Sequence, residues 1–436
     1  MAEPSDSPII GHKLQGLKYR DKLLPLFDRL HDVGCQRDKA GNRKLHFDHY
    51  CALILLFLLN PVLRSFRALQ QASLLEQVRR KVGCSRTSLG SLSEAVEVFE
   101  PQRLEAIIAE LWAEVPPSRG VGKQYVRQVL TAVDGSVVKT LASLAEAAYL
   151  RDKNGKTHCG WRFHTHFEID RQLPVRIEVT SALNGGKTDE KHVLRKALQP
   201  DRCYVMDRWY AEFALWNEIV AVGSSYVCRI RDHSNLDEVV EERPVSEAAR
   251  RAGVLRDIVV KLGTSHKADA RPNHPVRVIL VKAEPHQKTG GRKGGTAGSP
   301  SDGILRIATN LLDVPAEIIA DIYKHRWSIE LFFRFFKHVL GCRHLLSTHP
   351  VGIQIQAYCA IIACLLIHLW TGGKPTLRTF EMLCLYLQGW ASLEEVMAHL
   401  EKLKAKSREP PASRSSRPSR GNRLPGLDRA PGTRIS

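Results

Sequence analysis

Three acidic residues stand where strands or helices would present them to a common point. Asp134 follows the apolar run 126–133, Asp207 follows the apolar run 203–206, and Glu330 lies in an aromatic-rich helical segment. Carboxylates at neighbouring strand ends can converge, which is what a site for a hard cation requires. Without a cation they would repel one another and bind protons more tightly. Taken singly, an Asp at a strand end is also explained as a turn former or a helix N-cap.

The segment around Glu330 carries a polar stripe. Tyr323, Arg326, Glu330 and Lys337 fall within an arc of about 60° on an ideal helix of about 100° per residue. A solvated face with an Arg–Glu pair at i,i+4 would explain the charges, but not the aromatic residues crowding the same segment. A carboxylate that binds a metal, next to Arg and Lys that bind phosphate, is the composition needed to cut or join a phosphodiester.

These motifs resemble those of the IS4 family of DDE transposases, which have an RNase H-like catalytic domain. The first acid of that family occurs in a DG or DS context, as at 134–136, and the second heads a D-R-G/W-Y element, as at 207–210. The Y-(2)-R-(3)-E-(6)-K signature of the family is met by Tyr323, Arg326, Glu330 and Lys337. The resemblance covers roughly residues 10–404.

The resemblance implies a Mg²⁺-dependent endonuclease and DNA strand transferase. Asp134, Asp207 and Glu330 would hold two Mg²⁺ ions per active site, with Mn²⁺ as a substitute. The enzyme would cut double-stranded DNA at the terminal inverted repeats of an insertion sequence and join the 3′-OH ends to target DNA, by hydrolysis and then transesterification. Tyr323, Arg326 and Lys337 would contact backbone phosphates. The partners implied are transposon-end and target DNA and a second copy of the chain in a synaptic complex, with no membrane and no small-molecule substrate.

Two other functions fit the same residues. One is a domesticated or inactive transposase that only binds DNA, and the other is an RNase H-like nuclease without strand transfer. The sequence disfavours a hairpin intermediate without deciding the second-strand route, because family members that form a hairpin stack a flipped base on an aromatic residue of the β insertion. The interval 217–326 has no Trp and no Phe. The terminal-repeat sequence, the target preference and the oligomeric state off DNA cannot be derived from the sequence.

The elements that position these residues predict an α/β fold, with an RNase H-like mixed sheet flanked by helices and interrupted by a β-rich insertion. Strand-like runs at 126–133, 163–170, 175–181, 202–206 and 226–230 alternate with helical runs at 189–198 and 210–222. The domains expected are a disordered 1–9, a helical DNA-end-binding domain 10–115, catalytic parts 126–230 and 305–345, the insertion 231–304 with a Gly-rich loop, a helical region 352–404 and a disordered basic tail 407–436.

Other conspicuous residues are assigned structural roles. The helix at 85–98 could read DNA as part of a helix-turn-helix, or could be a packing helix of a small bundle. His164 and His166 are expected on a sheet face, Asp189 as a helix N-cap, and Trp209 and Trp216 in the core. The Gly-rich 289–299 lacks the spacing of a P-loop.

Composition supports a polyanionic partner. The formal net charge of the 436 residues is +18, and part of the excess lies in 402–436, which holds ten Lys and Arg against Glu409 and Asp428. No secretory signal is recognised at the N-terminus, and the apolar runs 51–59 and 357–370 are shorter than the roughly 20 residues of a membrane span. Ten cysteines without a CxxC pair indicate reduced thiols. We therefore expect a cytoplasmic, nucleoid-associated bacterial protein.

Overall fold

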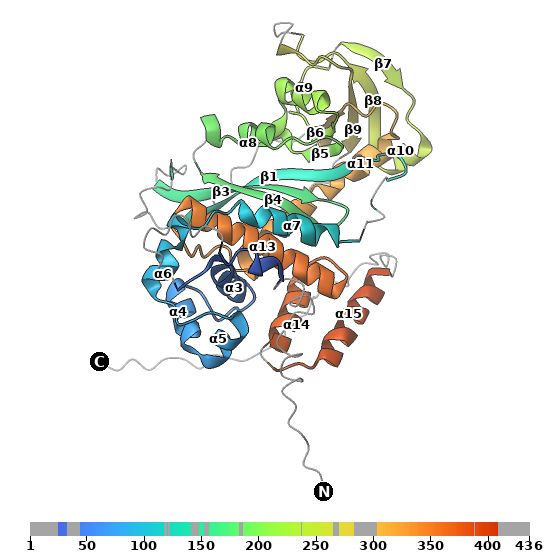
Figure 1. The fold of residues 1–436 in the computed structure, drawn as a ribbon. Coiled ribbons are helices and arrows are strands. Elements are labelled where there is room, and N and C mark those ends of the chain that lie inside the picture. The colour runs from blue at the N-terminus through green and yellow to red at the C-terminus, as the bar shows by residue number, and fades with distance from the viewer. Residues whose placement is uncertain are drawn as a thin grey trace, which may run out of the picture.

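The structure is a computed structural model, shown in Figure 1. It describes residues 25–32, 44–116, 120, 123–140, 148–151, 157–182, 186–236, 238–264, 270–282, 303–387 and 389–408, and all structural statements below concern these residues. Three predicted features lie wholly or largely outside them: the disordered 1–9, the Gly-rich 289–299 and the basic tail. Of the tail, only Ser407 and Arg408 are described, and they are the last two residues of a helix.

One mixed sheet runs through the molecule in the order β2-β3-β1-β5-β6-β10-β9-β8-β7, with β4 paired to β3. Strand β1 is antiparallel to β3 and parallel to β5, and β5 is parallel to β6. The order β4-β3-β1-β5-β6 is that of an RNase H-like sheet, so the predicted fold class is confirmed. Its strands are β1 (Val129–Thr140), β3 (Thr157–Glu168), β4 (Leu173–Ser181), β5 (Arg202–Met206) and β6 (Ser225–Arg229), with the short β2 (Ala148–Arg151) at the edge.

The segment 231–304 contributes strands that continue this sheet. The three strands concerned are β7 (Val239–Arg243), β8 (Val254–Val260) and β9 (Val276–Lys282), and β10 (Ile304–Thr309) follows them. Strand β10 is antiparallel to both β6 and β9, so it joins the strands of the insertion to the RNase H-like part. Figure 1 shows β7, β8 and β9 stacked beyond β6 at the upper end of the molecule.

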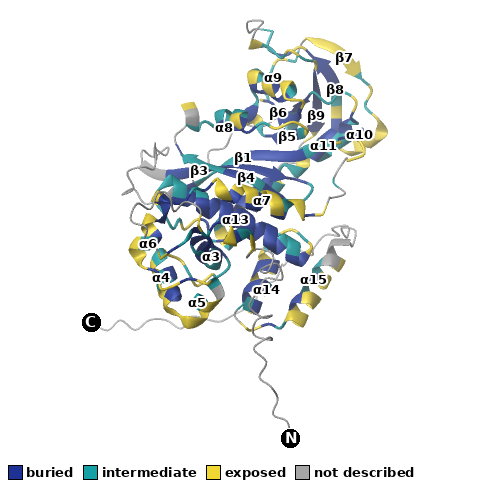
Figure 2. Cartoon of the chain, in the orientation of Figure 1, coloured by how far each residue is buried: buried dark blue, intermediate teal, exposed yellow. Residues whose placement is uncertain are grey.

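Helices cover the faces of the sheet. On the side of β5 and β6 lie α8 (Glu190–Lys196) and α9 (Phe213–Ala221), with α10 (Glu247–Arg251) near α11 (Ala316–His325). The helix α13 (Pro350–Thr371) packs on β4, α7 and α3. It is long and apolar enough to cross a membrane, but 83% of its apolar window is buried inside the protein. Figure 2 shows most of this helix in the colour of buried residues. It is therefore a core helix of this fold.

The N-terminal part is helical, as expected for 10–115 where it is described. It comprises α3 (Phe47–Leu58), α4 (Phe66–Leu74), α5 (Glu76–Val82), α6 (Leu89–Glu94) with the 3₁₀ turn η2 (Ala95–Glu97), and α7 (Arg103–Ala113). Within the segment 85–98, Leu92, Ala95 and Val96 are buried, which is the packing role considered above. DNA reading by this segment stays a prediction.

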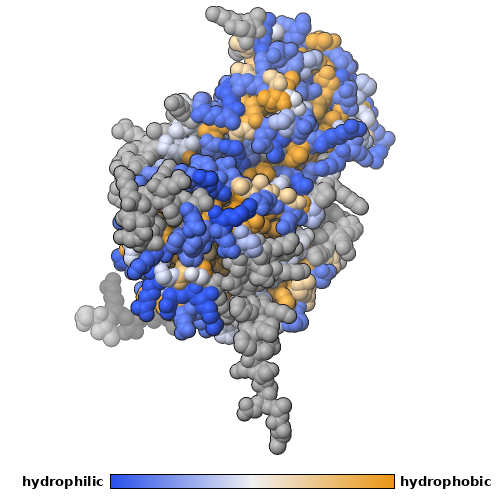
Figure 3. Space-filling model, in the orientation of Figure 1, coloured by the Kyte–Doolittle hydropathy of each residue, from blue (hydrophilic) through white to orange (hydrophobic). Residues whose placement is uncertain are grey.

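The C-terminal helices are α14 (Leu377–Leu387) and α15 (Leu393–Arg408), which pack on each other. On the face that Figure 3 shows, hydrophilic side chains form most of the described surface, with smaller hydrophobic areas between them.

Candidate active site

Sheet register brings the first two acids together. The parallel pairing of β1 and β5 ends with Ala132 opposite Val205, and each acid lies two residues beyond this pair. Asp134 and Asp207 are close enough for the negative charge of Asp207 to raise the pKa of Asp134. Asp207 directly follows β5 and caps the 3₁₀ turn η4 (Arg208–Tyr210), accepting a hydrogen bond of 2.8 Å from the backbone N–H of Trp209. The sequence placed both acids next to apolar strands, and their pairing follows from the parallel register.

The expectation that β1 ends at Asp134 is wrong. Strand β1 continues to Thr140 because residues after Asp134 keep pairing with β3, with Gly135 opposite His164. The parallel neighbour β5, however, stops at Met206. Asp134 therefore lies within β1, where β3 still pairs with one edge of the strand. The other edge of β1 has passed the end of β5 at this point, so a substrate can approach Asp134 from that side.

The helical block that carries the third acid is not one straight helix. Helix α11 ends at His325, Arg326 and Trp327 form a turn, α12 (Ser328–Arg334) follows, and the last turn η6 (Phe335–Val339) is a π-helix. The predicted common face of about 60° assumed an uninterrupted helix, so that assumption is wrong. Turns of π-helix inside α-helices occur frequently at functional sites.

Arg326 links the first and third acids across this turn. Its Nη2 lies 2.8 Å from Glu330 Oε1, and its Nη1 lies 3.7 Å from Asp134 Oδ2. Only 14% of the Arg326 side chain is exposed. The pairs are therefore shielded from solvent, and Arg326 offsets part of the negative charge of the acids.

The other two residues of the polar stripe also lie at this place. Lys337 Nζ donates a 2.8 Å hydrogen bond to the carbonyl oxygen of Val137, further along β1. Burial lowers the pKa of Lys337, with Asp134 acting in the opposite direction. Burial raises the pKa of Tyr323 to about 12, so its hydroxyl is a hydrogen-bond donor at neutral pH.

The electrostatics of Asp134 are those of a crowded acidic site. Burial, assisted by the negative charge of Asp207, raises the pKa of Asp134 to about 7. The guanidinium of Arg326 and the backbone N–H of Gly135, 2.8 Å from Asp134 Oδ1, act in the opposite direction. A carboxyl group that is half-protonated near neutral pH would bind a divalent cation in place of its proton.

Sequence reasoning missed a fourth acid. Glu190, the first residue of α8, accepts a 3.2 Å hydrogen bond from the hydroxyl of Tyr210 and lies 3.4 Å from Arg162 Nε. Burial raises the pKa of Glu190, with Arg162 as the main opposing influence. The available signal was its place directly after the predicted N-cap Asp189.

The chemistry of the three acids suits a divalent cation, but their ligand atoms are farther apart in this structure than those around a bound ion. Carboxylate oxygens are the preferred ligands of Mg²⁺, and the mutual charge of Asp134 and Asp207 is what such an ion neutralises. In the described part of the chain, however, the groups of three possible metal ligands whose atoms lie within 4.8 Å of one another do not include Asp134, Asp207 and Glu330. Glu330 instead faces Arg326.

The structural roles assigned to other residues are mostly confirmed. His164 and His166 lie buried on β3, where burial lowers their pKa values to about 4 and about 3. Asp189 is the N-cap of α8 and accepts from the backbone N–H of Lys191. The prediction that Trp209 is a core residue is wrong. Trp209 is 50% exposed, because the short turn after Asp207 directs its side chain outward.

Comparison with known proteins identifies the family of this region. Residues 127–366, a range that includes all three predicted catalytic acids, match the model of the family described as Transposase DDE domain. The putative transposase y4zB of Sinorhizobium fredii is 27% identical over 218 residues, 50% of this chain and 54% of the relative. The probable transposase for insertion sequence element IS5377 of Geobacillus stearothermophilus is 27% identical over 209 residues, 48% of each protein.

Two further similarities are shorter or more distant. The putative transposase for insertion sequence element IS4SA of a Synechocystis strain is 37% identical over 93 residues, 20% of this chain and 28% of the relative. A solved piggyBac transposase synaptic complex with hairpin DNA has a TM-score of 0.40 and 11% identity, covering 92% of this chain and 85% of that one. This chain matches about half the length of the first two curated relatives.

Proposed function

The chain belongs to the transposase DDE domain family, and on this premise we propose that it is a DNA transposase of the IS4 type. In this proposal it cuts DNA at the terminal inverted repeats of an insertion sequence and joins the 3′-OH ends to target DNA. The observation that supports it best is the adjacency of Asp134 and Asp207 in the β1–β5 register, with Arg326 between Asp134 and Glu330.

Asp134, Asp207 and Glu330 are the residues that would hold the metal, two Mg²⁺ ions per site with Mn²⁺ as a substitute. Bound there, the ions would activate the attacking water or 3′-OH and stabilise the leaving oxygen. The carboxylates themselves supply the ligand oxygens, and Glu190, close to Asp134, adds negative charge to the site.

Arg326, Lys337 and Tyr323 are proposed to bind the DNA backbone next to the cut. The planar guanidinium of Arg326 pairs with carboxylate here and can pair with phosphate in the same geometry. We expect the phosphate to compete with Glu330 for this guanidinium. Lys337, fixed by its hydrogen bond to Val137, would act as a point charge, and Tyr323 would donate from its hydroxyl.

The partners in this proposal are transposon-end DNA, target DNA and a second copy of the chain. The helical region 10–115 would bind the ends, and the two copies would act in a synaptic complex. The basic tail would add salt-sensitive affinity that does not depend on sequence. Association with the bacterial nucleoid follows from these DNA contacts.

The decisive experiment mixes labelled terminal-repeat DNA with a supercoiled target and Mg²⁺. Joined products are expected from the wild type, and Asp134→Asn, Asp207→Asn and Glu330→Gln should each reduce cutting by at least about a thousandfold. Asp321→Asn is the matched control. Asp321 lies on α11 and forms an ion pair with His325, so its carboxylate is not one of the three proposed metal ligands.

The remaining outcomes separate the alternatives. Cutting without joined products would indicate an RNase H-like nuclease. Specific binding of the repeats without cutting would indicate a DNA-binding protein that has lost catalysis. Cutting by Asp134→Asn at the wild-type rate would refute the assignment of the site.

A further inference from the structure

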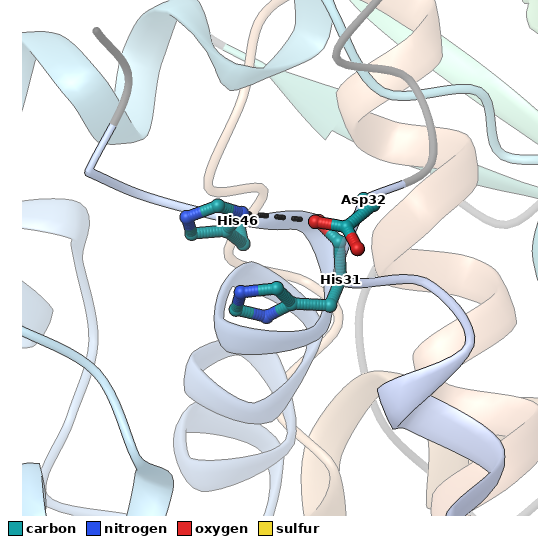
Figure 4. A group of neighbouring side chains, drawn as sticks. All are labelled: His31, Asp32 and His46. Carbon is teal, nitrogen blue, oxygen red and sulfur yellow. Dashed lines mark hydrogen bonds between the residues drawn. The ribbon is translucent and has the colours of Figure 1, made fainter.

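A second cluster of metal-binding side chains lies in the N-terminal region, on different elements from the three acids. It forms where the segment 25–32 meets the start of α3. In the described residues, two groups of three have ligand atoms within 4.8 Å of one another: His31, Asp32 and His46, and His31, Asp48 and His49. Figure 4 shows the first group, with the imidazole rings of His31 and His46 face to face and the Asp32 carboxylate beside them.

Two distances in the second group fit ligands around one small ion, and all three ligand atoms lie within 4.8 Å of one another. Asp48 Oδ2 lies 2.9 Å from His31 Nδ1 and 3.6 Å from His49 Nε2. A tetrahedral Zn²⁺ ion with bonds of about 2.0–2.1 Å holds its ligand atoms about 3.3–3.4 Å apart. Each distance therefore differs from this ideal by less than about half an ångström.

Burial adds an independent observation. Asp48 is only 9% exposed. Its second oxygen, Oδ1, and the Nδ1 atom of His49 are both buried and have no hydrogen-bond partner within the described structure. A buried carboxylate with an unsatisfied oxygen is costly unless a cation or further donors compensate it.

A cluster held by hydrogen bonds alone explains less. It accounts for the contact of His31 with Asp48, and the position of Asp48 in the first turn of α3 suits the helix dipole. It does not account for a second imidazole facing the same carboxylate oxygen, or for the unsatisfied Asp48 Oδ1. A bound cation accounts for the convergence of two imidazoles on Asp48 Oδ2, and it neutralises the buried charge of the Asp48 carboxylate.

We propose that His31, Asp48 and His49 form a binding site for a divalent transition metal ion of the zinc class. Two imidazole nitrogens and one carboxylate favour Zn²⁺ over Mg²⁺, which prefers oxygen ligands. His46 stacks on His31 with ring centroids 3.8 Å apart, which fixes the orientation of the His31 ring. The ion would tie the segment 25–32 to α3 and stabilise the N-terminal helical region.

Untagged full-length protein in an Asp134→Asn background tests this site without a contribution from the first acid of the catalytic site. After chelation and dialysis, titration with Co²⁺ should give one equivalent bound with the intense visible absorption of a four-coordinate ion. Zn²⁺ should displace it and raise the Tm. Asp48→Asn and His49→Asn should each weaken metal binding by at least about tenfold. Loss of a residue that only supports a ligand already costs about that much, and loss of a direct ligand should cost more.

His233→Ala is the control, since His233 lies in the loop after β6, far along the chain from α3. Circular dichroism on each metal-free variant shows whether it is folded, and a folded variant that has lost both the absorption and the Tm rise supports the site. Absence of the four-coordinate spectrum from the wild type, or equal binding by wild type and Asp48→Asn, would overturn it. Loss of binding in Asp32→Asn but not in Asp48→Asn would reassign the ion to the His31, Asp32 and His46 group and refute the present choice of ligands.

Discussion

The carboxylate of Glu190 lies directly against the backbone of Gly135, so that a Cβ atom on Gly135 would be 2.5 Å from Glu190 Oε1. No side chain fits at this position while Glu190 keeps its place. Gly135 follows Asp134, and its backbone N–H hydrogen-bonds Asp134 Oδ1. The DG dipeptide of the first acidic motif thus has a local reason: glycine admits a second carboxylate next to the first.

We predict that Gly135→Ala destabilises the protein through this contact. Overpacking of a buried site costs about 1–3 kcal/mol, and the contacts of Glu190 with Arg162 and Tyr210 prevent an easy escape. Urea unfolding should show this cost in the wild-type background and a smaller cost in the Glu190→Ala background, where the clash is gone. Equal costs in both backgrounds would contradict the explanation.

The raised pKa of Asp134 predicts a pH-dependent penalty in the metal-free protein. The pKa is about 7 in the folded state against an ordinary value of 3.8, so the unfolded state binds fewer protons between these values. Stability should therefore fall as pH rises from about 4 to about 7, and the penalty is complete above that range. Since 22% of the side chain is exposed, about 4 kcal/mol is an upper limit.

Asp134→Asn should remove this penalty. In EDTA, it should raise the free energy of unfolding at pH 8 and have little effect at pH 4, whereas Asp321→Asn should not reproduce this difference. Addition of Mg²⁺ at pH 8 should raise the Tm of the wild type and not that of the variant. A stabilisation of the same size at both pH values would show that ionisation of Asp134 is not its cause.

The sequence predicted the three acids because each carries a local signal, but it did not predict how their surroundings assemble. The runs before Asp134 and Asp207 are apolar enough to identify strands, and the RNase H-like order fits their alternation with helices. The contact between Glu190 and Gly135 depends on how α8 lies over β1 and β3, which no local pattern encodes. The turn at Arg326 and Trp327 between α11 and α12 contains no Gly or Pro that would indicate a helix end in the sequence. Apolar periodicity alone therefore predicted a continuous helix.

The orientation of Trp209 was also beyond local pattern. An aromatic residue after a buried strand is most simply a core residue, and Trp216, seven residues later, is indeed fully buried and stacked on Tyr226. Trp209 instead faces outward from the turn capped by Asp207, with Lys191 Nζ 5.6 Å from its ring.

The two tryptophans should therefore respond differently to truncation. Trp216→Ala removes a core side chain and should cost about 3–5 kcal/mol of stability. Trp209→Ala should leave the Tm nearly unchanged but weaken several-fold the binding of transposon-end DNA that carries unpaired bases at the cut, since exposed aromatic rings stack on unpaired bases. Thermal unfolding and a binding assay on both variants check this. Unchanged DNA affinity in Trp209→Ala would assign that ring no role at the site.

A buried ion pair joins the inserted strands to the segment that leads into α11. Arg277 on β9 pairs with Asp257 on β8 through two contacts of 2.8 and 2.6 Å, and its Nη1 donates to the carbonyl oxygens of Leu311 and Leu312. Both side chains of the pair are about 5% exposed. Residues 310–315 connect β10 to α11 and thus to the turn that carries Arg326.

Arg277→Met should therefore lower stability by about 3–5 kcal/mol, because it leaves the Asp257 carboxylate buried and unpaired. The double variant Arg277→Met with Asp257→Leu should recover most of that loss, since two apolar residues leave no unpaired charge. The control is Arg256→Met, which breaks an equally well-formed but exposed pair with Glu242 on the neighbouring strands and should change the Tm far less. If the two single variants lost equal stability, burial would not be what makes the Arg277–Asp257 pair important.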